Sequence, residues 1–587
     1  MTTPIHRARV ALRERRRRAR QQAGYAAIFM ALLVAGILFP IASFAVDVAR
    51  WYVEGERVQA AADAAAMAGV TYLPADFNSA KAEAIKVAGK NGYPNSGTST
   101  VTVSQGVKPT QLQVVITSQI HNSIASSWGD DYTTISRTAV ADYNGPAPMG
   151  SPCNTFGNEP LGTTTYGPSA SQLSVPSGAS CSSTPQFWGS VYGPDIYKVD
   201  GDQVMTRYCS GSESNCTSGN NAEFRPEGYF YIIRVGAGAI GKAVTVQLYD
   251  PAYVYTGQYC DSKPGTPSSN TINPYVTDAK TRYNTSTTAN SFCNGDSSYT
   301  AKSGITTATT TSYGLRAPIE TFVPSDAPPM SGCVKQYPGY ASSAVTLNAL
   351  TSTNAAYNQK LAAVFHQWQT LCTFTPAAAG DYYLQVRTNV ALSTSSYDGR
   401  GGYDGNMTVF SQTGDNTSVK GAGGNTFAIR AFATGASSSI SVAGWDRMGM
   451  WMNTTGSSAT FNLVRVVPAA ATKTLDFEFF DGGDAASGGS FQILPPTETP
   501  ITLTGCAGTG VVTGTLTGCK LTGVSSSAGY NGKSQHIRVP IPATYTCDWA
   551  SSGGCWFRIT VNFGTASVHD TTTWTARIDG DPVRLIK

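Results

Sequence analysis

The pattern of hydrophobic and polar positions changes twice along the chain, and the three patterns predict three kinds of structure. An uncharged, largely apolar run covers residues 23–46, and an alanine-rich stretch at helical spacing follows it up to residue 69. From about residue 151, short runs alternate apolar and polar positions between turn residues, which is typical of half-buried strands. The sequence therefore predicts a mixed fold, with an N-terminal helix, a small α+β unit and then mainly β structure.

The apolar run is long enough to cross a bilayer. As a helix, residues 23–46 extend roughly 36 Å, more than the bilayer core of about 30 Å. Pro40 would kink such a helix without ending it. We predict a transmembrane helix that is retained as an anchor. The alternatives are a cleaved secretory signal, which also begins basic and then apolar, and a soluble core helix, which this length disfavours.

Charge around this run predicts its orientation. Eight arginines and Glu14 give residues 1–22 a formal charge of +7, while the whole chain carries +4, so the remainder carries −3. The positive-inside rule then places residues 1–22 in the cytoplasm and residues 47–587 outside the membrane. A basic tail can also bind nucleic acid, but beside an apolar helix it is better explained by topology and anionic lipid. We therefore expect the membrane as a partner, and no nucleic acid.

Four charged residues follow the run at helical spacing. Asp47, Arg50, Glu54 and Arg57 stand at positions i, i+3, i+7 and i+10, so neighbours in the set can pair on one face of the helix exit. Residues 60–68 are almost all alanine. Such a smooth face suits close packing between membrane helices, and the alternative is a helix that packs on its own domain.

Specific motifs occur in this region in a recognisable order. GYAAIFMAL stands at residues 24–32, AVDVARWYV at 45–53 and RVQAAADAAAMAG at 57–69. This order resembles the TadE/TadG-like family of tight-adherence (Flp) pilus assembly. The resemblance implies a bacterial inner-membrane or cell-membrane protein that anchors or assembles an adhesive pilus together with other pilus-assembly or pilin-like proteins. It also implies a pilin-like α+β unit, for which residues 78–92 offer a second helix and strands are expected around 100–103, 112–117 and 134–141.

Two family features are missing. Pilin-type members are cleaved after a glycine and carry a glutamate five residues later, whereas Phe29 stands at that distance from Gly24. This argues against processing by a prepilin peptidase. The D-x-S-x-S run of a von Willebrand A metal site, found in some large relatives, is also missing from the sequence.

An internal repeat organises the region after residue 147. YIIRV at 231–235 and VQLYD at 246–250 match NLVRV at 462–466 and FEFFD at 477–481, with an offset of 231 residues throughout. The simplest account is two copies of one β-sandwich. The predicted division of the chain is a cytoplasmic tail (1–22), a transmembrane helix (23–46), an α+β unit (47–147), a first sandwich with a Ser/Thr-rich insertion near 255–315 (148–435) and a second sandwich (436–587).

Cysteine use agrees with export. All 12 cysteines follow residue 152, no C-x-x-C occurs and the five histidines do not cluster, so disulfides are favoured over metal. Matching places in the two copies favour Cys333–Cys372 and Cys506–Cys547. Further expected pairs are Cys209–Cys216, Cys260–Cys293 and Cys153–Cys181. Local pairing in the second copy, Cys506–Cys519 with Cys547–Cys555, is the alternative.

The sequence predicts no enzyme and no cofactor. GAGAIG at 236–241 has the form G-x-G-x-x-G, but a strand follows it instead of the helix that a dinucleotide site needs, so we interpret it as a hairpin loop. Neither a G-x-S-x-G elbow nor an H-E-x-x-H motif occurs. The oxygen-rich loops at 398–406 and 481–484 could bind Ca²⁺, although most such loops are plain turns.

The outer region is expected to be structural or adhesive. The alternative function is a membrane-tethered adhesin that binds carbohydrate or a surface without belonging to a pilus. Exposed aromatic rings would carry that function, and the candidates are Trp445, Trp451, Trp549 and Trp556. In sandwiches, however, such rings more often fill the core.

Overall fold

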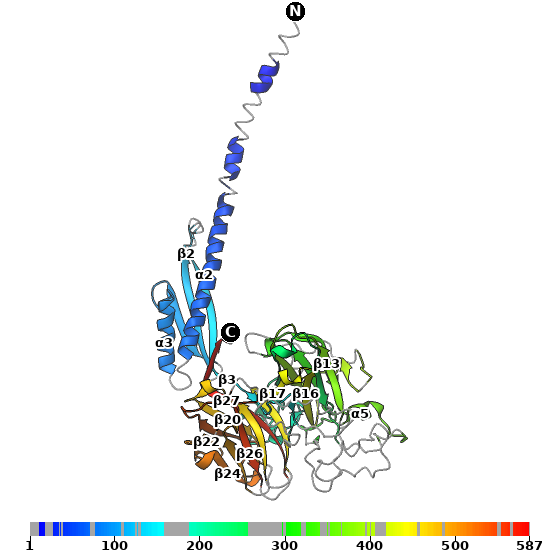
Figure 1. Ribbon diagram of the computed structural model, residues 1–587. Helices are drawn as coiled ribbons and strands as arrows, with labels where there is room; N and C mark the ends of the chain where they lie inside the picture. Colours follow the sequence, from blue (N-terminus) through cyan, green and yellow to red (C-terminus); the bar gives the residue numbers. More distant parts are fainter. Residues whose placement is uncertain are drawn as a thin grey trace, which may run out of the picture. The chain divides into compact units, whose positions relative to one another are not determined.

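The computed structural model divides into two compact units, Met1–Tyr143 with Val583–Lys587, and Asn144–Pro582 (Figure 1). The first boundary lies four residues before the expected one. The described residues are 11–17, 27–34, 36, 39–70, 77–106, 111–123, 126, 129, 131–157, 187–255, 296–297, 301–318, 324–340, 349, 353–365, 367–393, 396–399, 401–404, 418–454, 458–483, 488–499, 501–548, 553–563 and 568–585.

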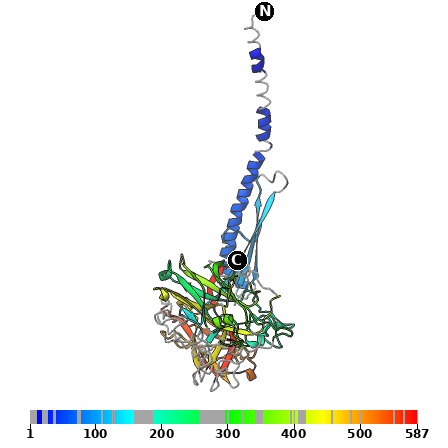
Figure 2. The ribbon, with the colours of Figure 1, turned by 90° about the vertical axis from the view of Figure 1, so that its right-hand side faces the viewer.

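The first unit is a small α+β fold. Helices α2 (Phe39–Val70) and α3 (Phe77–Lys90) precede the strands β1 (Ser99–Gln105), β2 (Gln111–His121) and β3 (Tyr132–Pro146). The three strands form an antiparallel sheet with β2 in the centre. Figures 1 and 2 show this sheet running alongside α2. The predicted second helix and all three predicted strands are thus present.

Alanine sets how closely the two helices approach. The buried face of α2 includes Ala61, Ala62, Ala65 and Ala66, and it packs with alanines of α3 and apolar residues of the sheet. At Gly69 a Cβ atom would lie 2.6 Å from the Ala80 carbonyl oxygen. The alanine face is therefore occupied within its own unit, which is the second of the two interpretations given above.

No helix within the described part of the chain has both the length and the apolar character needed to span a membrane. Residues 23–26, 35, 37 and 38 of the expected span lie outside the described residues.

The second unit consists of β strands. In chain order they are β4 (Pro148–Met149), β5 (Thr155–Phe156), β6 (Phe187–Tyr192), β7 (Cys216–Thr217), β8 (Asn220–Asn221), β9 (Tyr229–Val235), β10 (Val244–Tyr249), β11 (Thr311–Arg316), β12 (Pro329–Tyr337), β13 (Trp368–Phe374), β14 (Gly380–Arg387), β15 (Tyr403–Asp404), β16 (Gly424–Ala433), β17 (Ile440–Trp445), β18 (Arg447–Thr454), β19 (Ala459–Arg465), β20 (Thr474–Phe480), β21 (Gly489–Leu494), β22 (Ala507–Gly510), β23 (Gly514–Thr515), β24 (Lys520–Val524), β25 (Ser534–Pro540), β26 (Trp556–Asn562) and β27 (Val568–Leu585). A short helix, α5 (Gln359–Val364), precedes β13.

The strand pairing repeats. In the first copy, one layer has the order β12–β11–β14–β9 and the other β13–β10–β16. In the second copy the same orders are β24–β21–β26–β19 and β25–β20–β27. The two motif pairs found in the sequence therefore occupy equivalent strands, β9 with β19 and β10 with β20. The large outer region is mainly β, as predicted.

The two copies exchange an edge strand across the predicted boundary at residue 435. Strand β17 follows residue 435, yet it pairs with β9 of the first copy. The short strand β4, at the start of the first copy, pairs with β19 of the second copy. The two exchanged strands also pair with each other. In the other layer, β6 lies between β16 and β18 and so joins the copies. Pairing across copies completes edges that would otherwise be open.

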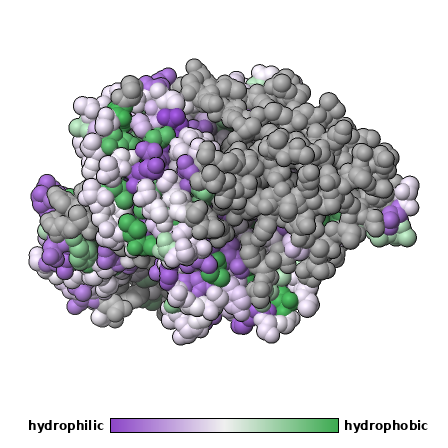
Figure 3. Space-filling model, turned by 90° about the horizontal axis from the view of Figure 1, so that it is seen from below, coloured by the Kyte–Doolittle hydropathy of each residue, from purple (hydrophilic) through white to green (hydrophobic). Residues whose placement is uncertain are grey.

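The core of this unit is apolar and rich in aromatic rings. One continuous buried cluster includes residues of both copies, among them Tyr231, Phe427, Phe477 and Trp574. At the join between copies, Trp188 of β6 lies opposite Trp451 of β18, with ring centroids 5.2 Å apart and both side chains buried. On the face drawn in Figure 3, the described apolar residues are scattered among polar ones.

The disulfides correct one expected pair. Cys333 is bonded to Cys372 and Cys209 to Cys216, but Cys506 is bonded to Cys519, and Cys547 to Cys555. Cys506 adjoins β22, an extra strand outside β25, and Cys519 adjoins β24. This bridge therefore joins the two layers at the outer edge, as Cys333–Cys372 does between β12 and β13. The extra hairpin β22–β23 places Cys506 where it can bond to Cys519. Cys153 is also disulfide-bonded, whereas Cys181, Cys260 and Cys293 lie outside the described residues.

Candidate functional site

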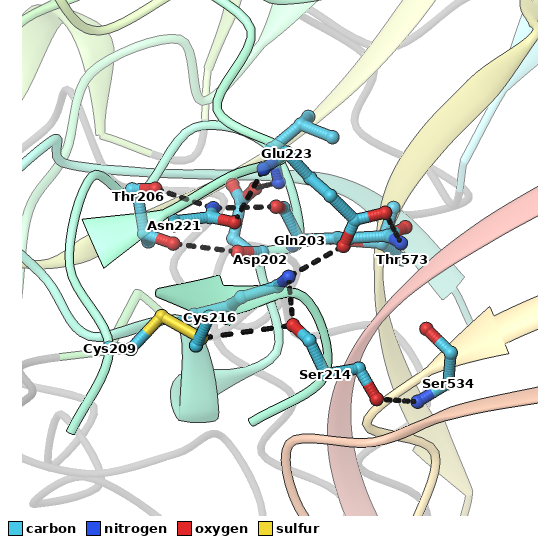
Figure 4. A network of polar contacts seen from close by, with 12 residues as sticks. Asp202, Gln203, Thr206, Cys209, Ser214, Cys216, Asn221, Glu223, Ser534 and Thr573 are labelled. Atoms are coloured by element: carbon cyan, nitrogen blue, oxygen red, sulfur yellow. Dashed lines mark hydrogen bonds and ion pairs between the residues drawn. A yellow bond between two sulfur atoms is a disulfide. The ribbon is translucent and has the colours of Figure 1, made fainter. Parts of the chain in front are cut away.

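A connection of the first copy lies across the second copy and brings buried polar groups together. This junction connection, residues 193–228, runs from β6 to β9. Gln203 N donates to Thr573 Oγ1 at 2.9 Å, and Gln203 Nε2 donates to Glu478 Oε1 at 3.1 Å. Ser534 N donates to Ser214 Oγ at 3.1 Å (Figure 4). The junction connection thus bonds to strands β20, β25 and β27 of the other copy.

A buried ion pair lies at the centre of the junction. Lys198 has a fully buried side chain, and its Nζ lies 2.6 Å from Glu223 Oε2 and donates to the Ser214 carbonyl oxygen at 2.6 Å. Its ammonium also lies 4.9 Å from the centre of the Phe480 ring, in the second copy. Gln203 Nε2 donates to the other oxygen of Glu223 at 3.0 Å.

The pKa shifts of this pair follow from burial and from mutual attraction. Burial lowers the pKa of Lys198, and the adjacent Glu223 opposes that shift. Burial alone would raise the pKa of Glu223, but the Lys198 ammonium, assisted by Arg447, holds it below its ordinary value. The favoured state is therefore a charged pair within the junction connection.

A second carboxylate orders the start of the junction connection. Asp202 is buried, and its Oδ1 accepts hydrogen bonds from the Val204 N, the Met205 N and the Tyr229 hydroxyl. Its Oδ2 accepts from Tyr192 N at 2.9 Å. Burial raises the pKa of Asp202, and these donors partly offset the shift. The carboxylate therefore fixes the connection to both β6 and β9.

One group of side chains has the composition of a metal site. Ligand atoms of Cys209, Glu213 and Cys216 lie within 4.8 Å of one another. The two sulfur atoms are bonded to each other, and the Glu213 carboxylate accepts hydrogen bonds from the backbone of Ser210 and Gly211. Since a thiolate is the form that binds a metal, the arrangement in this structure is a cross-linked loop.

The helix-exit charges predicted from the sequence lie in the first unit, where they contact strands as well as one another. Asp47 is buried, lies 3.9 Å from Arg50, and accepts a hydrogen bond from Ser123 N at 2.9 Å. Glu54 accepts hydrogen bonds from the Ser118 and Tyr93 hydroxyls. Arg50, Glu54 and Arg57 line a groove of about 760 Å³ along α2. The four residues thus share one side of the helix.

The remaining sequence candidates are turns and loops outside the junction connection. GAGAIG is the turn between β9 and β10, where residues 237–239 form a 3₁₀ turn. In the two oxygen-rich loops, Asp398 pairs with Lys335 at 3.2 Å and Asp481 accepts from Gly532 N at 2.7 Å. Residues 400, 405–406 and 484 of these loops lie outside the described residues.

The tryptophans proposed as a sugar platform are mostly buried. Trp445, Trp451 and Trp556 all belong to the core set, and Trp549 lies outside the described residues. The buried rings therefore offer no exposed surface to a sugar.

Sequence reasoning missed the junction residues. Lys198, Asp202, Gln203 and Glu223 stand in a connection without regular hydrophobic alternation, so the pattern did not distinguish them. A usable signal was the charge density of KVDGDQ at 198–203 in a chain with only 13% charged residues.

Comparison with known families concerns the N-terminal region. Residues 24–73 match the family model Tad, described as "Putative Flp pilus-assembly TadE/G-like". The N-terminal region is TadE/TadG-like. The matched region contains all of α2 and the apolar run from residue 24 onward, and the predicted resemblance is confirmed there. No curated protein and no solved structure matches the chain.

Proposed function

We propose that this chain is a single-pass envelope protein of Flp-type pilus assembly. The single observation that carries the proposal is the TadE/TadG-like match at residues 24–73. In this proposal the apolar run at 23–46 anchors the chain and the arginine-rich tail lies in the cytoplasm, because positive charge is retained on that side. The proposal includes no reaction and no cofactor.

The outer module is proposed to be a rigid structural or adhesive part of that assembly. Three features support rigidity: an exchanged strand, a buried ion pair within the junction connection, and cystines at the outer edges of both sandwiches. Such a module suits presentation or load bearing outside the cytoplasm, where disulfides persist.

A carbohydrate-binding adhesin outside a pilus is the weaker alternative. That function requires exposed ring faces, and three of its four candidate tryptophans are buried. We therefore place the partners of this chain among pilus-assembly or pilin-like proteins and the membrane.

The test is genetic and topological. Deletion of the gene should abolish Flp-type pili, and the full chain supplied in trans should restore them. A chain ending at Tyr143 is the matched control, since it keeps the first unit apart from the last five residues. Protease added to spheroplasts should remove the outer module and leave the basic tail protected. Normal piliation in the deletion strain would contradict the proposed role.

A further inference from the structure

The end of the β2–β3 hairpin lies beside the first turns of α2 after the apolar run. Trp51 Nε1 donates to Asn122 Oδ1 at 2.9 Å, and Ser123 N donates to Asp47 Oδ1. Arg50 also donates to the Ser123 hydroxyl. In Figures 1 and 2, the hairpin end points toward the N-terminal part of the helix. The hairpin end is therefore bonded to residues 47–51.

This position has a consequence if the proposed anchor holds, and the inference rests on that proposal. Residue 51 follows the end of the span by five residues, or roughly 7.5 Å of helix. The polar layer on each side of the hydrocarbon core is about 5–7.5 Å thick, so residue 51 lies at its outer limit. Residues bonded to positions 47–51 therefore lie at the level of the lipid headgroups.

Two tyrosine side chains exposed there suit that environment. Tyr52 is 71% exposed and Tyr132, at the start of β3, is 54% exposed. His121 packs edge-on against Tyr132, with ring centroids 5.3 Å apart. Tyrosine is enriched at membrane interfaces, because its ring is apolar and its hydroxyl is polar. Phe44 and Val46, at the end of the proposed span, are also exposed.

Asp131, next to Tyr132, is exposed to solvent, whereas the acidic group that directly follows the apolar run is covered. Asp47 directly follows the apolar run, yet only 1% of it is exposed, and it is bonded to Ser123 and Arg50. A carboxylate without partners would be costly beside hydrocarbon. Ser123 can offset this cost only if the hairpin end lies at the level of Asp47, next to the end of the apolar run.

We propose that the hairpin end, residues 121–123 with Tyr132, rests together with Tyr52 in the headgroup layer of the membrane. The partner is a lipid surface. The first unit would then sit directly on the bilayer, held by both its helix and its sheet, and the orientation of that unit would be fixed relative to the membrane.

Quenching by brominated lipid tests the contact in the full chain. Tyr132→Cys and Ser104→Cys each carry a bimane label after reconstitution into liposomes of brominated phospholipid. Ser104 is exposed on β1 opposite Gln113, eight residues along β2 from His121, or roughly 26 Å away. The label at 132 should lose about half of its fluorescence or more relative to ordinary lipid, since tyrosine sites of this kind lie within the interface, and the label at 104 should not change.

The outcomes separate this inference from the proposed function. Full chain released by alkaline extraction of the same liposomes overturns the anchor and this contact together. Retained chain with an unquenched label at 132 overturns the contact alone. A label at 132 that is shielded from aqueous iodide but not quenched by brominated lipid means that another protein covers the hairpin end, and this also overturns the contact. Matching circular dichroism of both variants controls for folding.

Discussion

The two sandwich copies share their core strands and differ in the polar groups on equivalent strands. In the first copy, β10 presents Gln247, which accepts from Arg430 Nε at 2.7 Å, and the Arg430 guanidinium lies over the Trp368 ring. In the second copy, β20 presents Asp476 and Glu478, and Glu478 accepts from Gln203 of the junction connection. The equivalent positions therefore bond within the copy in one case and between copies in the other. The two copies therefore have the same strand pairing, and they differ in the polar side chains that form the junction.

The comparison implies that the copies are stable only together. Trp451 is 1% exposed and lies opposite Trp188 at the join. Replacing a buried tryptophan with alanine costs about 3–5 kcal/mol, because both contacts and packing are lost. Trp451→Ala should therefore destabilise the whole second unit in one denaturation step, with amide protection in β14 and β26 falling together. Trp574→Ala, inside the second copy, is the control, and loss of protection in β26 alone in both variants would mean that the copies unfold independently.

The ion pair at the junction gives the next largest effect. Lys198→Met leaves the Glu223 carboxylate without its ammonium partner at a site where only 17% of that side chain is exposed. Breaking a buried pair in this way costs about 3 kcal/mol, chiefly because one charge stays buried. Guanidinium denaturation of the full chain measures the loss. Lys198→Met combined with Glu223→Gln should recover most of it, and an equal loss in the double variant would show that the lysine acts through packing alone.

The sequence predicted the strands within each copy, but it did not predict the strand pairing between the copies. Alternation and the 231-residue offset predicted β9, β10 and their equivalents, because a half-buried strand requires apolar residues at every second position. Strand exchange leaves no such trace. β17 has the same alternation whether it pairs with β9 or with β19, so the boundary at 435 was placed by chain order. The same holds for Cys506, whose partner depends on an extra edge hairpin that has no counterpart among the described residues of the first copy.

The outer cystines allow a finer comparison of the copies. Cys333–Cys372 closes 39 residues and Cys506–Cys519 closes 13. If a bridge acts by restricting the unfolded chain, these loops correspond to about 4 and about 3 kcal/mol. Replacing both cysteines of a pair with alanine should therefore cost about 1 kcal/mol more in the first copy than in the second, as measured by denaturant midpoint at constant slope. The reverse order would mean that local packing, rather than loop length, decides the contribution.

The smallest expected effect depends on pH and belongs to the second copy. His536 Nδ1 lies 3.1 Å from Asp476 Oδ1 and its Nε2 lies 4.0 Å from Glu478 Oε1. Burial disfavours the imidazolium, but Asp476 and Glu478 outweigh it, and the pKa of His536 lies above its ordinary value of 6.5. A group whose pKa is raised by folding stabilises the fold below the unfolded pKa, and that contribution is lost as the pH rises through the folded pKa.

The stability of the second copy should therefore decline slightly from pH 6.5 upward, by about 0.5 kcal/mol for a partly exposed pair. His536→Gln should remove that decline and leave the first copy unaffected, because the first copy has Thr370 and Gln247 in the corresponding layer, joined by a hydrogen bond of 3.0 Å between neutral groups. Denaturation between pH 6 and 8 gives the measurement, and Thr370→Val is the neutral control. An unchanged slope in His536→Gln would assign the pH dependence to another group and would remove this difference between the copies.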